Sequence, residues 1–340
     1  MRPNRSLLIG TTASAGILAL ILDSQTALTG AAEGIDLCVR TVIPALFPFF
    51  LLSMLLTGSV LGTELSFMNP VGKLVGIPKG SEPILLAGLL GGYPVGAQCV
   101  GQAYASGQLS KADARRMLGF CSNAGPSFIF GMTSFLFENK AVPFTLWTIH
   151  IISALITGFL LPGGSSVEII RPKKAQIEIG QALQKSLTVT ATVCGWVVIF
   201  RIILSFLKRW FFWFLPPTFQ IILTGILELT NGYVGLNAIS NDQLRFILAS
   251  LFLSFGGICV VLQTASVTRQ AGLDMGYYFP GKLIQTFINV LISSIAAGFL
   301  FGDGTSVNYP ILILIPIAVF IAVQIKKRKN SSSIPAPSVV

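Results

Sequence analysis

Long apolar stretches alternate with short polar connectors along most of the chain. Several of them run for about 18 residues or more with few or no charges, which is typical of helices that cross a membrane. We expect an all-α polytopic membrane protein with about eight transmembrane helices in a single membrane domain, residues 1–325. The predicted spans lie near residues 7–22, 37–61, 118–137, 141–161, 183–207, 244–268, 280–301 and 309–325.

Two further apolar stretches, residues 82–105 and 211–237, are interrupted by residues that a helix interior disfavours. Charge positions indicate how the first one lies. If 82–105 crossed the membrane fully, Lys111, Arg115 and Arg116 would face the outside, against the tendency of basic residues to stay in the cytoplasm. We therefore predict that 82–105 is a re-entrant, broken helical hairpin.

The same argument favours a second re-entrant hairpin at 211–237, because it keeps Arg269, Lys282 and the tail at 326–340 on the cytoplasmic side. If 244–268 were the re-entrant element instead, Arg269 and Lys282 would be left outside, and the sequence leaves that alternative open. Both termini are expected in the cytoplasm, in a multi-pass protein of the cell membrane. Residues 326–340 are expected to form a basic, disordered tail.

The composition agrees with this picture. The chain of 340 residues is 53% hydrophobic and 11% charged, with a mean hydropathy of +0.77, whereas soluble domains carry about 25% charged residues. The net charge of +10 would indicate nucleic acid in a soluble protein, but the basic residues here cluster at loops and ends. The lipid bilayer is therefore the expected partner, and no nucleic-acid partner is expected.

Motifs that carry chemistry are scarce. The five cysteines are scattered without CxxC spacing and His150 is the single histidine, so no metal site is expected. The sequence contains no phosphate-binding Walker loop, no HExxH and no GxSxG. We expect neither an enzyme nor a cofactor. Arg2 and Arg5 ahead of an apolar run also fit a cleaved signal peptide, but a retained first span balances the later segments better.

The first interruption is Gly-Gly-Tyr-Pro at 91–94. The arm from 82 to 91 is about 15 Å long at the helical rise, half of a roughly 30 Å hydrocarbon core, so the break is expected near the membrane midplane. Glycine permits a close approach, and Pro94 suits the first position of a new helix, whose free N–H groups would point into the membrane centre. Several secondary transporters build their substrate sites in this way. The candidate site therefore includes Gly91, Gly92, Tyr93, Pro94, Gly96 and Gln98.

A second break lies in 119–131, within a predicted span. There Asn123 can cap a helix, Gly125 can turn the chain and Pro126 can start the next apolar helix. A buried Asn amide offers two donors and two acceptor lone pairs, enough to bind a polar solute. It would equally well satisfy only the backbone of its own turn.

A third break lies in 225–235. Glu228 is the only acid deep inside an apolar stretch, which indicates an ion or substrate pathway. It would otherwise be half of a structural pair, for instance with Arg201, or lie near the outer interface. Asn231 and Gly232 follow it and join the candidate site.

A weak internal repeat links the two halves of the chain. FGGICVVLQ at 255–263 echoes LGGYPVGAQ at 90–98 in its glycine pair and final glutamine. Paired interruptions in two repeats mark the binding site in many transporters, although two ordinary glycine-rich helix contacts would also explain the match. We predict an inverted repeat, and the candidate site gains Gly256, Gly257 and Gln263.

Four motifs occur in order over residues 35–300: LLGGYPVGAQ, FCSNAGPSFIFG, GILELTNG and FLSFGGICVVLQTASV. Together they resemble the YlbJ-type sporulation integral membrane proteins, of the nucleoside-recognition (Gate) domain family. The resemblance implies Gate-like repeats over 35–161 and 180–300, and a cytoplasmic-membrane protein of an endospore-forming bacterium that contributes to spore formation, including the cortex. Besides lipid, the partners considered are a small polar solute, a second copy of the chain and sporulation membrane proteins, and the sequence leaves the oligomeric state open. Where a histidine-containing stretch like GGLSVHAQ is expected, this chain has GGICVVLQ, so no role of that histidine carries over.

Two functions follow from these expectations. The first is a secondary transporter or permeation pathway for a small polar solute, which includes nucleoside-like solutes, with Glu228 carrying a coupling cation. The alternative is a non-transporting membrane scaffold for assembly of the spore envelope, in which the broken helices only serve packing.

Overall fold

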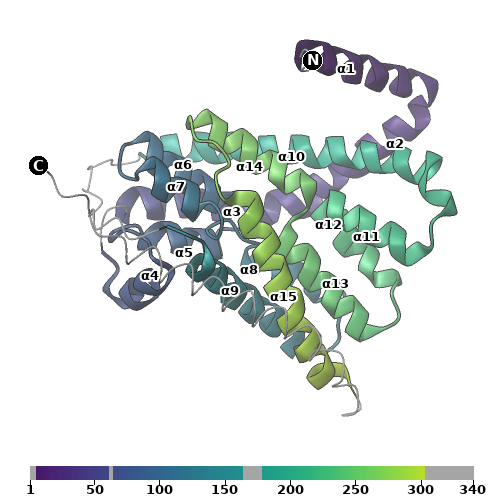
Figure 1. Cartoon of the computed structure of the whole chain (residues 1–340). Helices are drawn as coiled ribbons and strands as arrows, with labels where there is room; N and C mark the ends of the chain where they lie inside the picture. The colour runs from purple at the N-terminus through teal and green to yellow at the C-terminus, as the bar shows by residue number, and fades with distance from the viewer. Residues whose placement is uncertain (1–4, 61–63, 164–177, 303–340) are drawn as a thin grey trace, which may run out of the picture.

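The structure is a computed structural model, and it describes residues 5–60, 64–163 and 178–302 (Figure 1). Regular structure within these ranges is helical, with no β-strand, which confirms the all-α fold class. The predicted span at 309–325, the tail at 326–340 and the basic cluster at 171–174 lie outside the described residues. The helices are α1 Arg5–Leu22, α2 Ser24–Leu37, α3 Ile43–Val60, α4 Asn69–Val75, α5 Glu82–Leu90, α6 Val95–Ala105, α7 Lys111–Met117, α8 Pro126–Thr133, α9 Ala141–Leu160, α10 Ile179–Trp210, α11 Pro217–Leu227, α12 Leu229–Gly235, α13 Asp242–Phe255, α14 Gly257–Gln270 and α15 Tyr278–Phe301.

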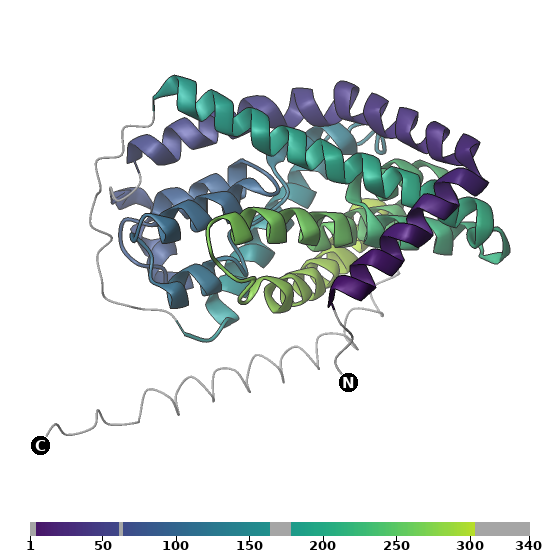
Figure 2. The ribbon, with the colours of Figure 1, turned by 90° about the horizontal axis from the view of Figure 1, so that it is seen from above.

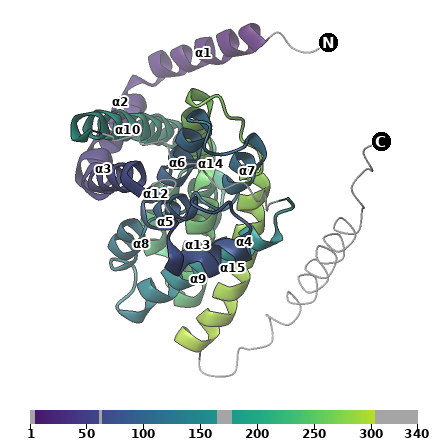
Figure 3. The same ribbon diagram turned by 90° about the vertical axis from the view of Figure 1, so that its left-hand side faces the viewer.

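Four predicted spans coincide with helices that are long and apolar enough to cross a membrane. They are α9, α10, the joined pair α13 and α14, and α15. A fifth arises among the described residues if α1 and α2, which meet at an angle of 101°, are counted as one bent span. α1 itself stands away from the other helices (Figures 1 and 3), and apolar side chains such as Ile17, Ile21 and Leu22 are exposed on it.

The predicted span at 37–61 is part of a longer helical run. α2 continues through a π-helical turn, Cys38–Val42, into α3. α2 was expected to be a polar connector, yet Asp23 caps it by accepting a hydrogen bond from Thr26 N at 3.3 Å. Its small residues Gly30 and Gly34 let it lie against α10, as Figure 2 shows.

The predicted span at 118–137 is much shorter than expected. Residues 121–125 are irregular, and only Pro126–Thr133 form an α-helix, α8. The break that the sequence indicates inside this stretch therefore occupies much of it and leaves only a short helix. The connector before it contains a helix, α7, which Ser110 caps by accepting a hydrogen bond from Asp113 N at 3.1 Å.

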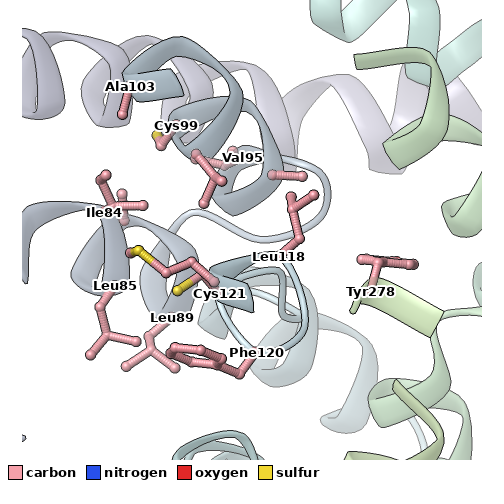
Figure 4. Close-up of a cluster of buried hydrophobic side chains, with 14 of the residues drawn as sticks. Ile84, Leu85, Leu89, Val95, Cys99, Ala103, Leu118, Phe120, Cys121 and Tyr278 are labelled. Carbon is pink, nitrogen blue, oxygen red and sulfur yellow. The ribbon is translucent and has the colours of Figure 1, made fainter. Parts of the chain in front are cut away.

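The stretch 82–105 is two helices, α5 and α6, that fold back on each other at Gly88 and Gly96. A Cβ at Gly96 would lie 1.5 Å from the Cys121 carbonyl oxygen and 2.9 Å from Gly88 Cα. A Cβ at Gly88 would lie 1.9 Å from the same oxygen. The irregular segment after α7 is thus wedged against both arms of this first hairpin, and Ile84, Leu85, Val95 and Cys121 gather there (Figure 4).

The stretch 211–237 forms a second hairpin of α11 and α12. A Cβ at Gly232 would lie 2.1 Å from Gly225 Cα, and the Phe252 ring of α13 would touch a Cβ at Gly225 at 2.3 Å. By contrast, α13 and α14 together are long enough to cross a membrane. The structure therefore favours 211–237, rather than 244–268, as the re-entrant element.

α9, the pair α13 and α14, and α15 run between two ends of the molecule. At one end, which we call the connector end (residues 105–117, 161–163 and 271–277), Arg116 Nε donates to Leu161 O at 3.4 Å. Tyr277 N donates to Arg115 O there at 3.0 Å. α9 ends and α15 begins at this end.

The opposite end (residues 134–140, 237–245 and 301) holds the start of α9, the start of α13 and the end of α15. Arg245 Nη1 donates to Leu136 O at 2.7 Å. The ring of Phe301 stacks on that of Phe137, with centroids 5.7 Å apart. α9, α13 with α14, and α15 thus connect the same two ends.

Candidate functional site

The tip of the first hairpin touches the break that precedes α8. Gly92 has a φ of +80°, and a Cβ there would lie 3.3 Å from Gly125 N. Both the backbone conformation and the contact therefore favour glycine at this position. The Tyr93–Pro94 peptide bond is cis. The sequence had predicted Pro94 as the first residue of the new helix, but in the structure Pro94 is the N-cap of α6.

The tip of the second hairpin meets the break between α13 and α14 in a similar way. Gly257 has a φ of +82°, and a Cβ there would lie 3.2 Å from Gly225 O. The two hairpins are linked through this break, because a Cβ at Gly256 would lie 3.3 Å from Tyr93 Cζ. Tyr93 Oη also donates to Leu253 O at 3.1 Å. Four interruptions that are distant in sequence thus form one junction.

The junction surrounds a cavity of about 50 Å³. Valine side chains from α10 and a phenylalanine from α8 make much of its wall apolar. Five residues of the predicted site line it: Gly92, Tyr93, Gly125, Glu228 and Gln263.

Glu228 is the carboxylate of this cavity, and it is 2% exposed. It is the N-cap of α12 and accepts hydrogen bonds from Thr230 N at 3.0 Å and from Asn231 N at 2.7 Å. Asn231 Nδ2 donates to it as well, at 2.7 Å. These donors and the positive end of the short helix stabilise a buried carboxylate without a cation. None of the ion pairs found in the described part of the chain includes Glu228.

Arg201 is connected to Glu228 through Asn231, and not directly as the pairing alternative supposed. Its Nη1 donates to Asn231 Oδ1, and its Nε donates to Glu33 at 2.9 Å. The polar chain Glu33, Arg201, Asn231, Glu228 therefore runs from an exposed groove between α2 and α10 to the cavity. Glu33 and Arg201 line that groove.

Asn123 does not line the cavity. It is fully buried, its Nδ2 donates to Phe120 O at 2.8 Å, and its Oδ1 accepts from Gln285 Nε2 at 2.8 Å. His150 Nε2 from α9 accepts from Ala124 N at 3.1 Å. These bonds fix the irregular segment, so the structure supports the backbone-satisfying alternative for Asn123 more than solute binding.

The remaining predicted residues shape the junction without entering the cavity. Gly91 is the C-cap of α5, and Pro126 starts α8 as predicted. Gly96 and Gly232 are the contact points within the two hairpins. Gln98 is half-buried in α6, outside the cavity lining.

Sequence reasoning missed Lys282 and Gln285 of α15. In the sequence analysis Lys282 was used only to assign the cytoplasmic side of the membrane. In the structure it is fully buried, and its Nζ donates to Tyr93 Oη at 3.0 Å. The available signal was a basic residue and an amide one turn apart at the start of an apolar helix. An intramembrane ionisable residue of this kind indicates a functional site.

Comparison with known proteins gives one relative. No family model matches the chain, and no solved structure matches it. The chain is similar to the sporulation integral membrane protein YlbJ of Bacillus subtilis (strain 168), with 25% identity over 315 residues that cover 78% of this chain and 76% of that protein. The resemblance to YlbJ-type sporulation integral membrane proteins is thereby confirmed.

Proposed function

We propose that the chain is a secondary transporter or permeation pathway for a small polar solute, in the cytoplasmic membrane of a sporulating bacterium. The observation that carries the proposal is the junction of two hairpin tips and two broken helices around one cavity. Irregular backbone at membrane depth persists only where it is buried in protein or lines a wet cavity. Secondary transporters use such interruptions to bind solute at the membrane centre.

The polar groups of the cavity match this use. Glu228 and Gln263 offer a carboxylate and an amide inside an otherwise apolar wall. A few placed polar groups in an apolar pocket are what small-molecule sites commonly show. Glu228 has all its acceptor contacts on one helix end, so its carboxylate is held in position before any solute arrives.

The size of the cavity bears on how a solute would enter. About 50 Å³ holds water or a very small molecule, whereas ligand pockets for drug-sized molecules measure about 300 Å³ or more. In this proposal the conformation is closed, and the hairpin tips separate to admit the solute. A nucleoside-like solute, which the Gate-domain resemblance favours, would need this separation.

A ligand screen by thermal stability tests the proposal. The purified protein is heated in detergent with nucleosides, bases, amino acids, dicarboxylates and divalent cations, each in turn. A ligand at about 100 times its dissociation constant stabilises the native state by about 2.7 kcal/mol. We expect one chemical class to raise the melting temperature selectively.

Matched glutamine variants locate the binding. Gln263→Leu removes the amide that lines the cavity and should abolish the ligand shift, whereas Gln98→Leu changes a half-buried glutamine outside it and should leave the shift intact. A shift that survives Gln263→Leu and Glu228→Gln together would place binding elsewhere. A folded, monodisperse protein that responds to nothing would favour the scaffold function.

A further inference from the structure

Lys282 has an unusual environment for an ammonium group. It lies one turn inside α15 and is fully buried. Its Nζ donates three hydrogen bonds, to Tyr93 Oη at 3.0 Å, to Gln285 Oε1 at 2.8 Å and to the carbonyl oxygen of Ser122. The Tyr93 ring centroid is 4.8 Å away. No ion pair within the described ranges includes Lys282.

Because Lys282 donates three hydrogen bonds, this arrangement depends on whether its amine is protonated. An ammonium has three N–H donors, but a neutral amine has two. The Ser122 carbonyl and Gln285 Oε1 can only accept, and Gln285 is held in this orientation because its Nε2 donates to Asn123 Oδ1 at 2.8 Å. The Tyr93 hydroxyl is therefore the partner that must change when Lys282 loses a proton.

Tyr93 has two ways to change, and both loosen the junction. Its hydroxyl now accepts from Lys282 and donates to the carbonyl oxygens of Leu253 at 3.1 Å and Ser254 at 3.3 Å on α13. After deprotonation it either loses the bond to Lys282 or turns to donate to the free amine, and then it leaves α13. Because Tyr93 belongs to the first hairpin tip and lines the cavity, either change leaves the tip with one anchor in place of two.

The side chains around Lys282 include titratable groups and several buried hydroxyls. Among the residues that the structure describes, the titratable groups that face it are Tyr93, Tyr278 on its own helix, Cys121 and His150, with no carboxylate. The hydroxyls of Ser122, Thr264 and Tyr278 are buried nearby, and those of Ser122 and Thr264 lie close enough to the Tyr278 hydroxyl to interact with it.

One of these hydroxyls, that of Tyr278, belongs to the first residue of α15, directly after the loop at 271–277 of the connector end. In Figure 4 Leu118 is the labelled residue nearest to Tyr278, and the two belong to one buried apolar cluster. We call the three hydroxyls the polar route. They link Ser122, whose carbonyl oxygen accepts from Lys282, to Tyr278 at the start of α15.

We propose that Lys282 is the proton-binding residue that locks the first hairpin tip, and that the proton is the coupling ion of this membrane domain. The protonated side chain holds Tyr93, Ser122 and Gln285 together and keeps the cavity closed. When it releases its proton towards the connector end, the amine keeps two N–H bonds, the tip loses one of its two anchors, and the junction loosens. The coupling role rests on the proposed transport function, but the lock itself does not.

A cysteine-accessibility experiment tests the lock without any solute. Val197 lines the cavity and is 3% exposed, so the modification rate of Val197→Cys by a methanethiosulfonate reagent reports opening. The rate is corrected for the five native cysteines with the unmodified chain. It is then divided by the rate of Ala105→Cys, an exposed residue at the connector end, to remove the pH dependence of the thiol itself.

We expect this ratio to rise at least about fivefold from mildly acidic to mildly alkaline pH, the factor that corresponds to losing one hydrogen bond of about 1 kcal/mol. Lys282→Arg stays protonated and should keep the ratio low at every pH. Tyr93→Phe keeps the ring but removes the link to α13, and should keep the ratio high at every pH.

The lock is overturned if the ratio of the wild type does not rise, or if either folded variant rises as the wild type does. A ligand-induced stability shift without this rise would reject the lock and leave the transport proposal standing.

Discussion

Glu228 shows how one buried side chain can serve both structure and site. Its carboxylate lines the cavity, and it also ends the first arm of the second hairpin and caps the second arm. Capping satisfies backbone N–H groups that the break would otherwise leave without partners. The hydrogen bonds at the start of α12 are therefore sufficient to hold the Glu228 carboxylate inside the protein, and no cation is needed.

Replacement of Glu228 tests this capping role. Glu228→Ala leaves Thr230 N and Asn231 N buried without an acceptor, and should lower the stability of the protein by about 1 to 3 kcal/mol. Glu228→Asp supplies a carboxylate of a favoured N-cap type and should lose less. Thermal unfolding in detergent measures both. Equal stability of Glu228→Ala and the wild type would show that the cap is not formed in solution.

At the residue scale, glycines and prolines were the most informative positions in the sequence. Gly92, Gly125 and Pro126 lie where their backbone properties predicted, since their chemistry is local. Lys282 and Gln285 could not be placed in this way, because their partners are up to 189 residues away. Asn123 is buried beside a helix break, as the sequence indicated, but its side chain bonds to other protein groups. One of these is Gln285 of α15, which the sequence around Asn123 could not reveal.

The hairpins are held by backbone contact, an element-scale property that single substitutions can probe. In Gly96→Ala the new Cβ would lie 1.5 Å from the Cys121 carbonyl oxygen, so α6 must move away from the irregular segment. We expect a loss of about 3 kcal/mol or more, at the upper end of overpacking effects. Gly131→Ala in α8 is the control, because a Cβ there meets nothing within 4 Å.

Gly131→Ala should be neutral or stabilising by up to about 1 kcal/mol, since glycine is unfavourable inside a helix. Melting temperatures of the two purified variants make the comparison. If Gly96→Ala is tolerated as well as Gly131→Ala, the close packing of the first hairpin on residues 118–125 is wrong.

The contact of α2 with α10 depends on small residues in the same manner. A Cβ at Gly30 would lie 2.7 Å from Ser205 Oγ and 3.0 Å from Ile202 Cα. Gly30→Ile should therefore separate the two helices, weaken the Arg201–Glu33 link and lower the melting temperature by several degrees. Gly16→Ile in α1, where a Cβ meets nothing within 4 Å, should leave it unchanged. A similar effect of both substitutions would contradict the close packing.

The extent of each element was predictable where hydropathy alone decides it. α9, α10 and α15 follow from their apolar runs, because burial in lipid requires a continuous helix. α2 was missed because Asp23, Glu33 and Asp36 make it look like a connector, although no residue in it breaks a helix. The short α8 was overestimated, because an apolar run cannot show that half of it is buried as irregular chain.

At the scale of the whole molecule, the two ends differ in charge, and this difference predicts the orientation. The basic residues of the connector end and the segments packed on it are Lys73, Lys79, Lys111, Arg115, Arg116 and Arg269, whereas Lys140 and Arg245 belong to the opposite end. Basic residues close to membrane spans favour the cytoplasm. We therefore expect the connector end inside and residues 134–140 outside.

Labelling of single cysteines in intact cells checks this orientation. A membrane-impermeant maleimide should modify Asn139→Cys from the outside, and Ala105→Cys only after the membrane is permeabilised, since both residues are exposed in the structure. α9 connects the two ends, and its 20 residues span about 30 Å, the thickness of the hydrocarbon core. The two positions must therefore face opposite sides, and the reverse labelling pattern would mean that the basic end lies outside. In that case the polar route to Lys282 would open to the exterior, and the direction of proton entry would change with it.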